Sequence, residues 1–125
     1  MSTALHDLSA AVDVVAAFPP AVLTDGFEGI TIELRDADGP CFAIQSVGEV
    51  AGAGAELIGR IEISPDDDQW YVLEDPAFEP VTASNDLQIL RFDRTTRYVR
   101  WSCNVNGATP SVAVAVVFAQ QKKTF

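Results

Sequence analysis

The sequence contains a single histidine, His6, and only two cysteines, Cys41 and Cys103. One histidine cannot assemble a histidine-assisted nucleophile or a multi-histidine metal site, and two cysteines cannot complete a tetrahedral zinc site. Carboxylates number 18 in 125 residues, so pairs of them arise by chance and mark no glycosidase site. The aspartates of residues 66–68 lack EF-hand spacing and predict a solvated turn. We therefore expect no enzyme, no cofactor and no bound metal.

Long hydrophobic runs are also missing. No apolar run approaches the ~18 residues that a transmembrane helix needs, and no basic residue precedes the apolar N-terminal patch, as a signal peptide would require. The sequence therefore predicts a soluble protein that is made in the cytoplasm and has no membrane partner. Cys41 and Cys103 are expected to be free thiols.

Basic residues are scarce in most of the chain, which has a formal net charge of −10. Residues 1–90 carry 17 acidic and two basic residues, a charge of −15, whereas residues 91–125 carry +5. An acidic protein repels phosphate, so a nucleic-acid partner is not expected. Two interpretations of the split remain open: internal pairing of the arginines on an acidic surface, or a basic edge that meets the acidic edge of a neighbour.

The longest apolar alternation runs from Arg97 to Phe118. Its period of two predicts strands with one buried face, and Asn106-Gly107 predicts the turn of a hairpin between them. The opposite face of the second strand is apolar as well, which predicts a central strand covered on both sides. The residues expected to face the core are Val99, Trp101, Cys103, Val105, Val112, Val114, Val116 and Phe118.

Similar patterns predict strands elsewhere in the chain, with a flexible hairpin tip in the glycine-rich residues 48–59. About seven strands about a dozen residues apart, without a helix in the body, are typical of an antiparallel β-sandwich of jelly-roll or immunoglobulin-like type. We assign this single all-β domain to residues 25–125. The other predicted strands are Gly29–Arg35, Cys41–Val50, Leu57–Ser64, Trp70–Leu73 and Leu87–Phe92.

Residues 1–24 are predicted to form an N-terminal arm. Apolar residues in positions 4–17 follow one another at spacings of 3, 4 and 3, which suits a short helix. Phe18-Pro19-Pro20 would end that helix and continue as a stiff extended segment. The segment is therefore expected to be a short helix or an extended arm. Its spaced apolar residues are Leu5, Leu8, Val12 and Val15.

Four sequence pieces resemble a family of small structural proteins of tailed phages and prophages. These are LHDL at residues 5–8, GITIEL at 29–34, IEISPDDDQWYVL at 61–73 and RYVRWSCNVNGATPSVAVAVVFAQQKK at 97–123. The resemblance spans nearly the whole chain. The S-x-D…W and R-Y-V-R pieces are also similar to discoidin-type β-sandwiches, which bind sugars or lipid surfaces.

This resemblance implies a virion protein of the capsid cement or decoration type, on the outer surface of a phage head that it stabilises. Its partners would be the major capsid protein and copies of itself. The alternatives are a tail or neck component, or a discoidin-like carbohydrate-binding module that holds a host glycan on Trp70 and Tyr71, although core packing is favoured for Trp70 and Trp101. The candidate assembly contacts are Leu5, Leu8, Val12, Val15, Phe18, Arg91, Arg94, Arg97 and Arg100.

Overall fold

The computed structural model describes residues 12–28, 31–33, 37–93 and 95–122. All regular structure in these ranges is antiparallel β-sheet, which confirms the predicted all-β sandwich. No helix long and apolar enough to cross a membrane is found in the described part of the chain. The strands are β1 (Val12–Leu23), β2 (Phe27–Glu28), β3 (Ile32–Glu33), β4 (Ala37–Ser64), β5 (Tyr71–Val72), β6 (Asp86–Asp93) and β7 (Tyr98–Lys122).

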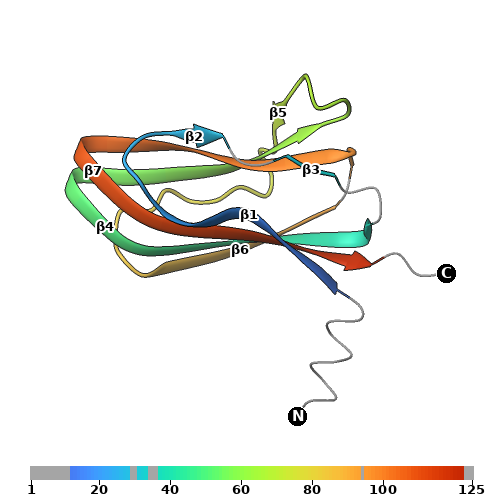
Figure 1. Cartoon of the computed structure of the whole chain (residues 1–125), viewed down its shortest axis with the longest axis horizontal. Coiled ribbons are helices and arrows are strands. Elements are labelled where there is room, and N and C mark those ends of the chain that lie inside the picture. Colours follow the sequence, from blue (N-terminus) through green and yellow to red (C-terminus); the bar gives the residue numbers. More distant parts are fainter. Residues whose placement is uncertain (1–11, 29–30, 34–36, 94, 123–125) are drawn as a thin grey trace, which may run out of the picture.

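Two very long strands, β4 and β7, organise the fold. They pair in antiparallel register from Ala37 opposite Lys122 to Ser64 opposite Tyr98. Each strand bends back midway, at Gly52 in β4 and at Gly107 in β7, where φ is +109° and +123°. A side chain at either glycine would meet the backbone of the other strand within 3 Å. The two-stranded ladder therefore folds over itself into two layers (Figure 1).

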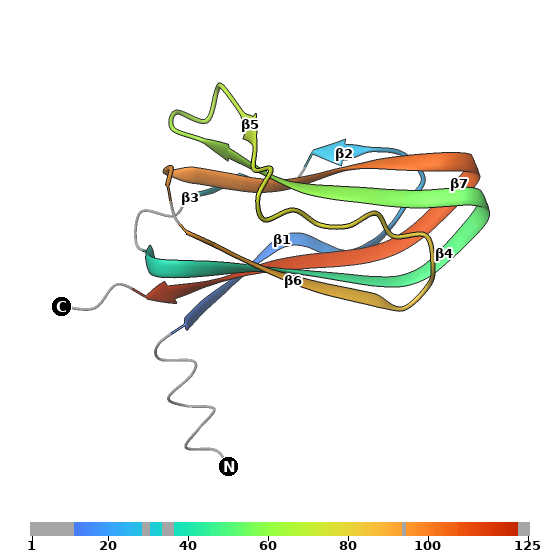
Figure 2. The same ribbon diagram turned by 180° about the vertical axis from the view of Figure 1, so that it is seen from behind.

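We call these layers upper and lower, as they lie in Figure 1. The upper layer contains β2, β3, residues 98–106 of β7, residues 56–64 of β4, and β5. The lower layer contains β1, residues 112–122 of β7, residues 37–50 of β4, and β6. The view from behind shows the connection from β5 to β6 descending from one layer to the other (Figure 2).

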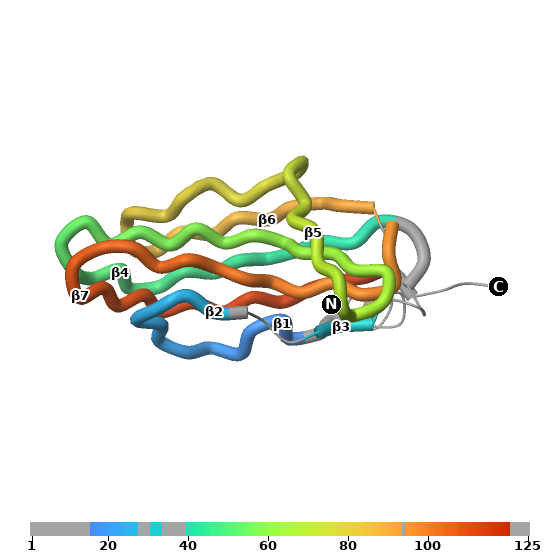
Figure 3. Tube along the Cα trace, turned by 90° about the horizontal axis from the view of Figure 1, so that it is seen from above, coloured from blue at the N-terminus to red at the C-terminus, as the bar shows by residue number. Residues whose placement is uncertain are grey.

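That connection closes one long side of the sandwich (Figure 3). Val81 forms a bridge to Leu57, with both N–H···O distances at 2.9 Å. The Gln88 side chain of β6 accepts from the Glu79 backbone N–H at 2.8 Å and donates to the Glu79 carbonyl at 3.0 Å. These bonds hold the edge of the upper layer to the edge of the lower one.

The hydrophobic core lies between the two layers, as the alternation of β7 predicts. Trp101 is fully buried; its Nε1–H donates to Gln45 Oε1 at 3.0 Å, and its ring lies 5.3 Å from that of Phe18. Val105 is the one predicted core residue of β7 that is only partly buried. Both cysteines are buried free thiols, as expected, and burial raises the pKa of Cys103. The confirmed core residues of β7 are Val99, Trp101, Cys103, Val112, Val114, Val116 and Phe118.

The predicted hairpin over residues 97–118 is wrong. Residues on both sides of Asn106-Gly107 belong to one strand, and both halves pair with β4. The turn signal marks the place where β7 passes from one layer to the other. The same correction applies to residues 41–64, where the two predicted strands and their glycine-rich tip form the single bent strand β4. The prediction that β7 is central is confirmed, because its lower half lies between β1 and β4.

The helical alternative for the N-terminal arm is wrong from Val12 onward. Residues 12–23 form β1, which pairs with β7 and contributes a strand to the lower layer. The β-branched valines of this segment suit a strand. Pro19 and Pro20 are accommodated because the register shifts between Ala16 and Ala21, so the ladder does not need their missing N–H groups. Residues 1–11 of the predicted arm lie outside the described residues.

The remaining strand predictions differ in extent. The strand predicted over Leu87–Phe92 is confirmed by β6. Of the strand predicted at 29–35, the described residues include β3, in which Ile32 is buried; Ile30 and Leu34 lie outside them. The strand predicted at 70–73 is reduced to the two exposed residues of β5.

Candidate functional site

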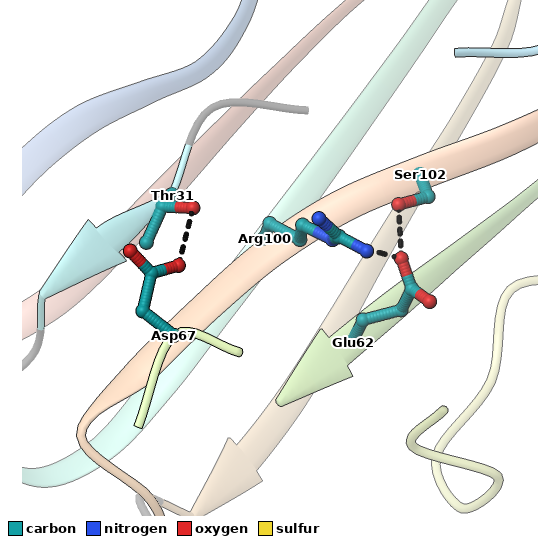
Figure 4. Close-up of polar contacts among 5 residues, drawn as sticks. All are labelled: Thr31, Glu62, Asp67, Arg100 and Ser102. Atoms are coloured by element: carbon teal, nitrogen blue, oxygen red, sulfur yellow. Dashed lines mark hydrogen bonds and ion pairs between the residues drawn. The ribbon is translucent and has the colours of Figure 1, made fainter. Parts of the chain in front are cut away.

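The outer face of the upper layer carries a compact polar cluster of Glu62, Arg100 and Ser102 (Figure 4). The register places Glu62 directly opposite Arg100, and Ser102 follows two residues later on the same face. Arg100 Nε donates to Glu62 Oε1 at 3.0 Å, and the Ser102 hydroxyl donates to the same oxygen. The side chains of Arg100 and Glu62 are only 14% and 12% exposed. The cluster is therefore a partly buried ion pair.

The segment from Ser64 to Trp70 folds over this cluster. The Trp70 ring lies against the Arg100 guanidinium, with 4.1 Å between Cζ and the ring centroid. In the middle of the segment, Asp67 Oδ1 accepts a hydrogen bond from Thr31 Oγ1 at 3.1 Å, which connects the strands on the far side of β7 to this turn (Figure 4). The turn is thus tied to the strands on both sides of β7, and the Trp70 ring shields the Arg100 guanidinium from water.

Asp66 holds the turn in shape. Its Oδ1 accepts the backbone N–H groups of Asp68 and Gln69, both at 3.0 Å, and the Ser64 hydroxyl at 3.1 Å. The hydrogen bond from the Gln69 backbone, followed by that from Asp68, lowers the pKa of Asp66. The carboxylate therefore organises its own turn. No group of three or more metal-ligating side chains occurs among the described residues.

The arginines of the predicted basic edge are separated by the fold. Arg97 pairs with Glu33 at 2.7 Å, and this hydrogen bond raises the pKa of Arg97. Arg100 pairs with Glu62 in the cluster above. Arg91 lies exposed on β6 in the lower layer, and Arg94 lies outside the described residues. The structure thus favours internal pairing over a continuous basic edge.

The apolar candidates of the N-terminal segment are also dispersed. Phe18 is 5% exposed and packs edge-to-face against Phe27 and at a tilt against Trp101, so it belongs to the core and not to an assembly contact. Val12 and Val15 lie in β1, opposite Gln121 and Phe118. Leu5 and Leu8 lie outside the described residues and remain predicted contacts.

Trp70 and Tyr71 do not form a common stacking platform. They are adjacent where β5 begins, so their side chains point to opposite sides. Trp70 is half-buried against Arg100, which corrects the expectation that it packs in the core. Tyr71 is 56% exposed, and its hydroxyl donates to Gln69 Oε1 at 3.3 Å. One face of the Trp70 ring is therefore already occupied.

The outer face of the lower layer has the opposite character. The registers place apolar side chains from all four of its strands side by side. Val22 and Leu87 are both 62% exposed and Ile89 is 57% exposed, values unusual for such large apolar side chains. We call this surface the apolar face and define it by Val22, Phe42, Ile44, Leu87, Ile89, Ala113, Ala115 and Val117.

Part of this surface was visible in the sequence. The apolar outward residues of the second half of β7 predicted a strand covered on both sides, and they line the apolar face as half-buried residues. The contributions of β1, β4 and β6 were missed, because the exposure of Val22, Phe42 and Leu87 depends on which strands lie beside one another. The sequence predicted that both faces of this part of β7 are covered, and the structure leaves its outer face, with the neighbouring apolar side chains, exposed.

The buried ion pair provides a test of the upper face. We expect the Glu62→Ala and Arg100→Ala substitutions to be coupled by about 1–3 kcal/mol in a double-mutant cycle, because either change alone leaves a charge in a shielded site. Urea unfolding of the four proteins measures this coupling. Glu33→Ala with Arg97→Ala is the matched control, since that pair is 35% and 50% exposed. Equal coupling in both cycles would contradict the shielding by Trp70 and its turn.

The chain matches no protein-family model and no curated protein sequence.

Proposed function

We propose that this protein is a structural virion protein that binds the outer surface of a phage head and stabilises it. The sequence resemblance supplies the virion setting. The observation that carries an assembly role is the contrast between the two outer faces. The upper face carries ion pairs and a fitted turn, and it exposes Tyr71 and Val72 of the short strand β5. The lower face exposes Val22, Phe42, Leu87 and Ile89 across three of its strands. A domain that works alone in water rarely keeps such a surface open.

The distribution of charge agrees with this role. The chain carries a net charge of −10, yet the centre of the apolar face is uncharged. Arg91 of β6 lies at one end of this face, opposite Phe42, and Asp93 lies two residues beyond it. Acidic groups at other surfaces keep the protein soluble and oppose random association, while an uncharged area permits close contact with another protein. Binding through such an area needs no catalytic groups, in line with the expectation of a non-enzymatic protein.

Binding to heads is the test. When the purified protein is added to heads that were prepared without it, we expect it to sediment with them into the pellet. The decorated heads should then be disrupted at a higher temperature than undecorated heads. Because Arg97 and Arg100 are already paired within the chain, we expect binding to persist at high salt, where free ionic contacts are screened. A chain without residues 1–11 keeps β1 whole and tests the predicted contacts Leu5 and Leu8.

Two outcomes separate the alternatives. Binding to isolated tails in place of heads would assign the protein to the tail or neck. Absence of binding to either particle at low and high salt would overturn the proposal. A host glycan that binds the wild type and is lost in Trp70→Ala, with the fold unchanged, would favour the carbohydrate-binding module.

A further inference from the structure

We propose that the apolar face is the contact between two copies of this chain, packed face to face through their lower layers. This inference goes beyond binding to a phage head and does not require it. It rests on the shape, the charge and the extent of the face.

The apolar face contains a depression beside a ridge. The depression, about 410 Å³, is shallow and is lined by residues 20–22 of β1, Ser46 and Gly48 of β4, and residues 113–115 of β7. Most of these side chains are small. A Cβ at Gly48 would meet Ala113 alone, at ordinary contact distances of 3.6 and 3.9 Å, so the space above Gly48 is open. The ridge is formed on β6 by Leu87 and Ile89, which protrude into solvent.

The register places the ridge where a second copy would need it. Leu87 lies opposite Ser46, and Ser46 lies opposite Ala115. Leu87 is therefore on the same face and in the same row as the depression, but on the edge strand β6, whereas the depression extends toward the other edge strand, β1. A two-fold axis parallel to the strands turns β6 of one copy over β1 and β7 of the other. Leu87 of each copy then enters the depression of its partner, and the interface is isologous.

The extent of the face suits a modest dimer. Four strands ~4.8 Å apart, with about seven residues rising ~3.3 Å each, give a footprint of about 440 Å² per copy before side-chain relief is counted. The two footprints together, with the added surface of protruding side chains, approach the smallest total area that specific protein interfaces bury, about 1,200 Å². We therefore expect association in the micromolar range and not a permanent dimer.

Charge determines how this contact responds to salt. Two copies, each with a net charge of −10, repel one another at long range. The centre of the apolar face carries no charged residue, and Arg91 lies at one end of it, opposite Phe42. Added salt screens the repulsion and leaves the apolar contact intact. The dimer should therefore become tighter as salt rises, whereas a contact made by a basic edge on an acidic edge would weaken.

Sedimentation equilibrium of the full chain measures this association. We expect dimers at about 100 µM protein, and at least a tenfold weaker association in Leu87→Asp. Val72→Asp introduces the same charge at a 47% exposed apolar residue of the upper layer and should change the affinity by less than about twofold. Circular dichroism checks that each variant is folded.

A second variant separates a fitted contact from general stickiness. Ala115→Leu fills the depression while it adds apolar surface. If Leu87 of the partner enters the depression, this change weakens the dimer about tenfold; if the face is merely hydrophobic, the change strengthens it.

Three results would overturn the inference: a wild-type chain that is monomeric at about 100 µM in high salt, a dimer that Leu87→Asp leaves intact, or a dimer that Ala115→Leu strengthens. The outcome is independent of the head-binding assay. A monomer that binds heads would leave the proposed function standing and remove this inference, and a dimer that binds neither heads nor tails would do the reverse.

Discussion

Replacing Trp101 with alanine should lower the free energy of unfolding by about 3–5 kcal/mol. The side chain is fully buried between the layers, packs on the Phe18 ring and donates a hydrogen bond to Gln45 from the opposite layer. The truncation would open a large cavity and leave Gln45 Oε1 without its donor. The cost therefore combines lost packing with an unsatisfied buried acceptor.

Urea unfolding followed by circular dichroism gives this value, and Trp70→Ala is the matched control. Trp70 is half-buried and covers Arg100 on the outer face, so its loss should cost about 1 kcal/mol. Trp101→Phe keeps most of the ring but removes the N–H group, and we expect an intermediate loss. If Trp101→Ala were no more destabilising than Trp70→Ala, the assignment of Trp101 as the link between the layers would be wrong.

The inward face of β7 could be predicted from sequence because it depends only on local alternation. Val99, Trp101 and Cys103 share one side of any strand, whichever strand lies next to it. The partner of that strand could not be predicted. Asn106-Gly107 gives the same signal for a hairpin and for a long strand that bends between layers, and only the register with β4 distinguishes them.

The ion pairs could not be predicted from the sequence for a related reason. Arg97 and Arg100 form a basic cluster in the sequence, but their partners Glu33 and Glu62 lie 64 and 38 positions away. Such pairs arise only after the strands are placed. The apolar face followed from the same placement: the outward residues of β7 predicted a cover, and the neighbouring strands extend this apolar surface with Phe42, Leu87 and Ile89.

Gly59→Ala should be strongly destabilising, although it adds only one methyl group. Gly59 is buried beneath the hydrogen bond between Gln45 and Trp101, and an added Cβ would overlap Gln45 Oε1 and lie 2.7 Å from Trp101 Nε1. Relief requires both large side chains to move within a packed core. Overpacking together with a broken buried hydrogen bond should cost about 3 kcal/mol or more.

Gly48→Ala, on the same strand, is the control for this change. Its added methyl group would lie 3.6 Å from the Ala113 Cβ and 3.9 Å from the Ala113 carbonyl oxygen, both ordinary contacts, and no strained backbone angle is involved. We expect its unfolding free energy to stay within about 1 kcal/mol of the wild type when measured at low protein concentration. A similar loss in both variants would show that Gly59 is not required for the contact between the layers.

A second substitution tests the cause of the Gly59→Ala defect. Gln45→Ala removes the side chain that the new methyl group overlaps. In the wild type it also removes the hydrogen bond that Gln45 Oε1 accepts from Trp101, whereas Gln45 Nε2 is buried without a hydrogen-bond partner among the described groups. In Gly59→Ala the added methyl group already disrupts the bond to Trp101. In the Gly59→Ala background, Gln45→Ala should therefore be less destabilising than in the wild type by at least about 1 kcal/mol. If the loss of unfolding free energy in the double variant equals the sum of the losses in the two single variants, the strain lies elsewhere in the strand and not at the Gln45 side chain.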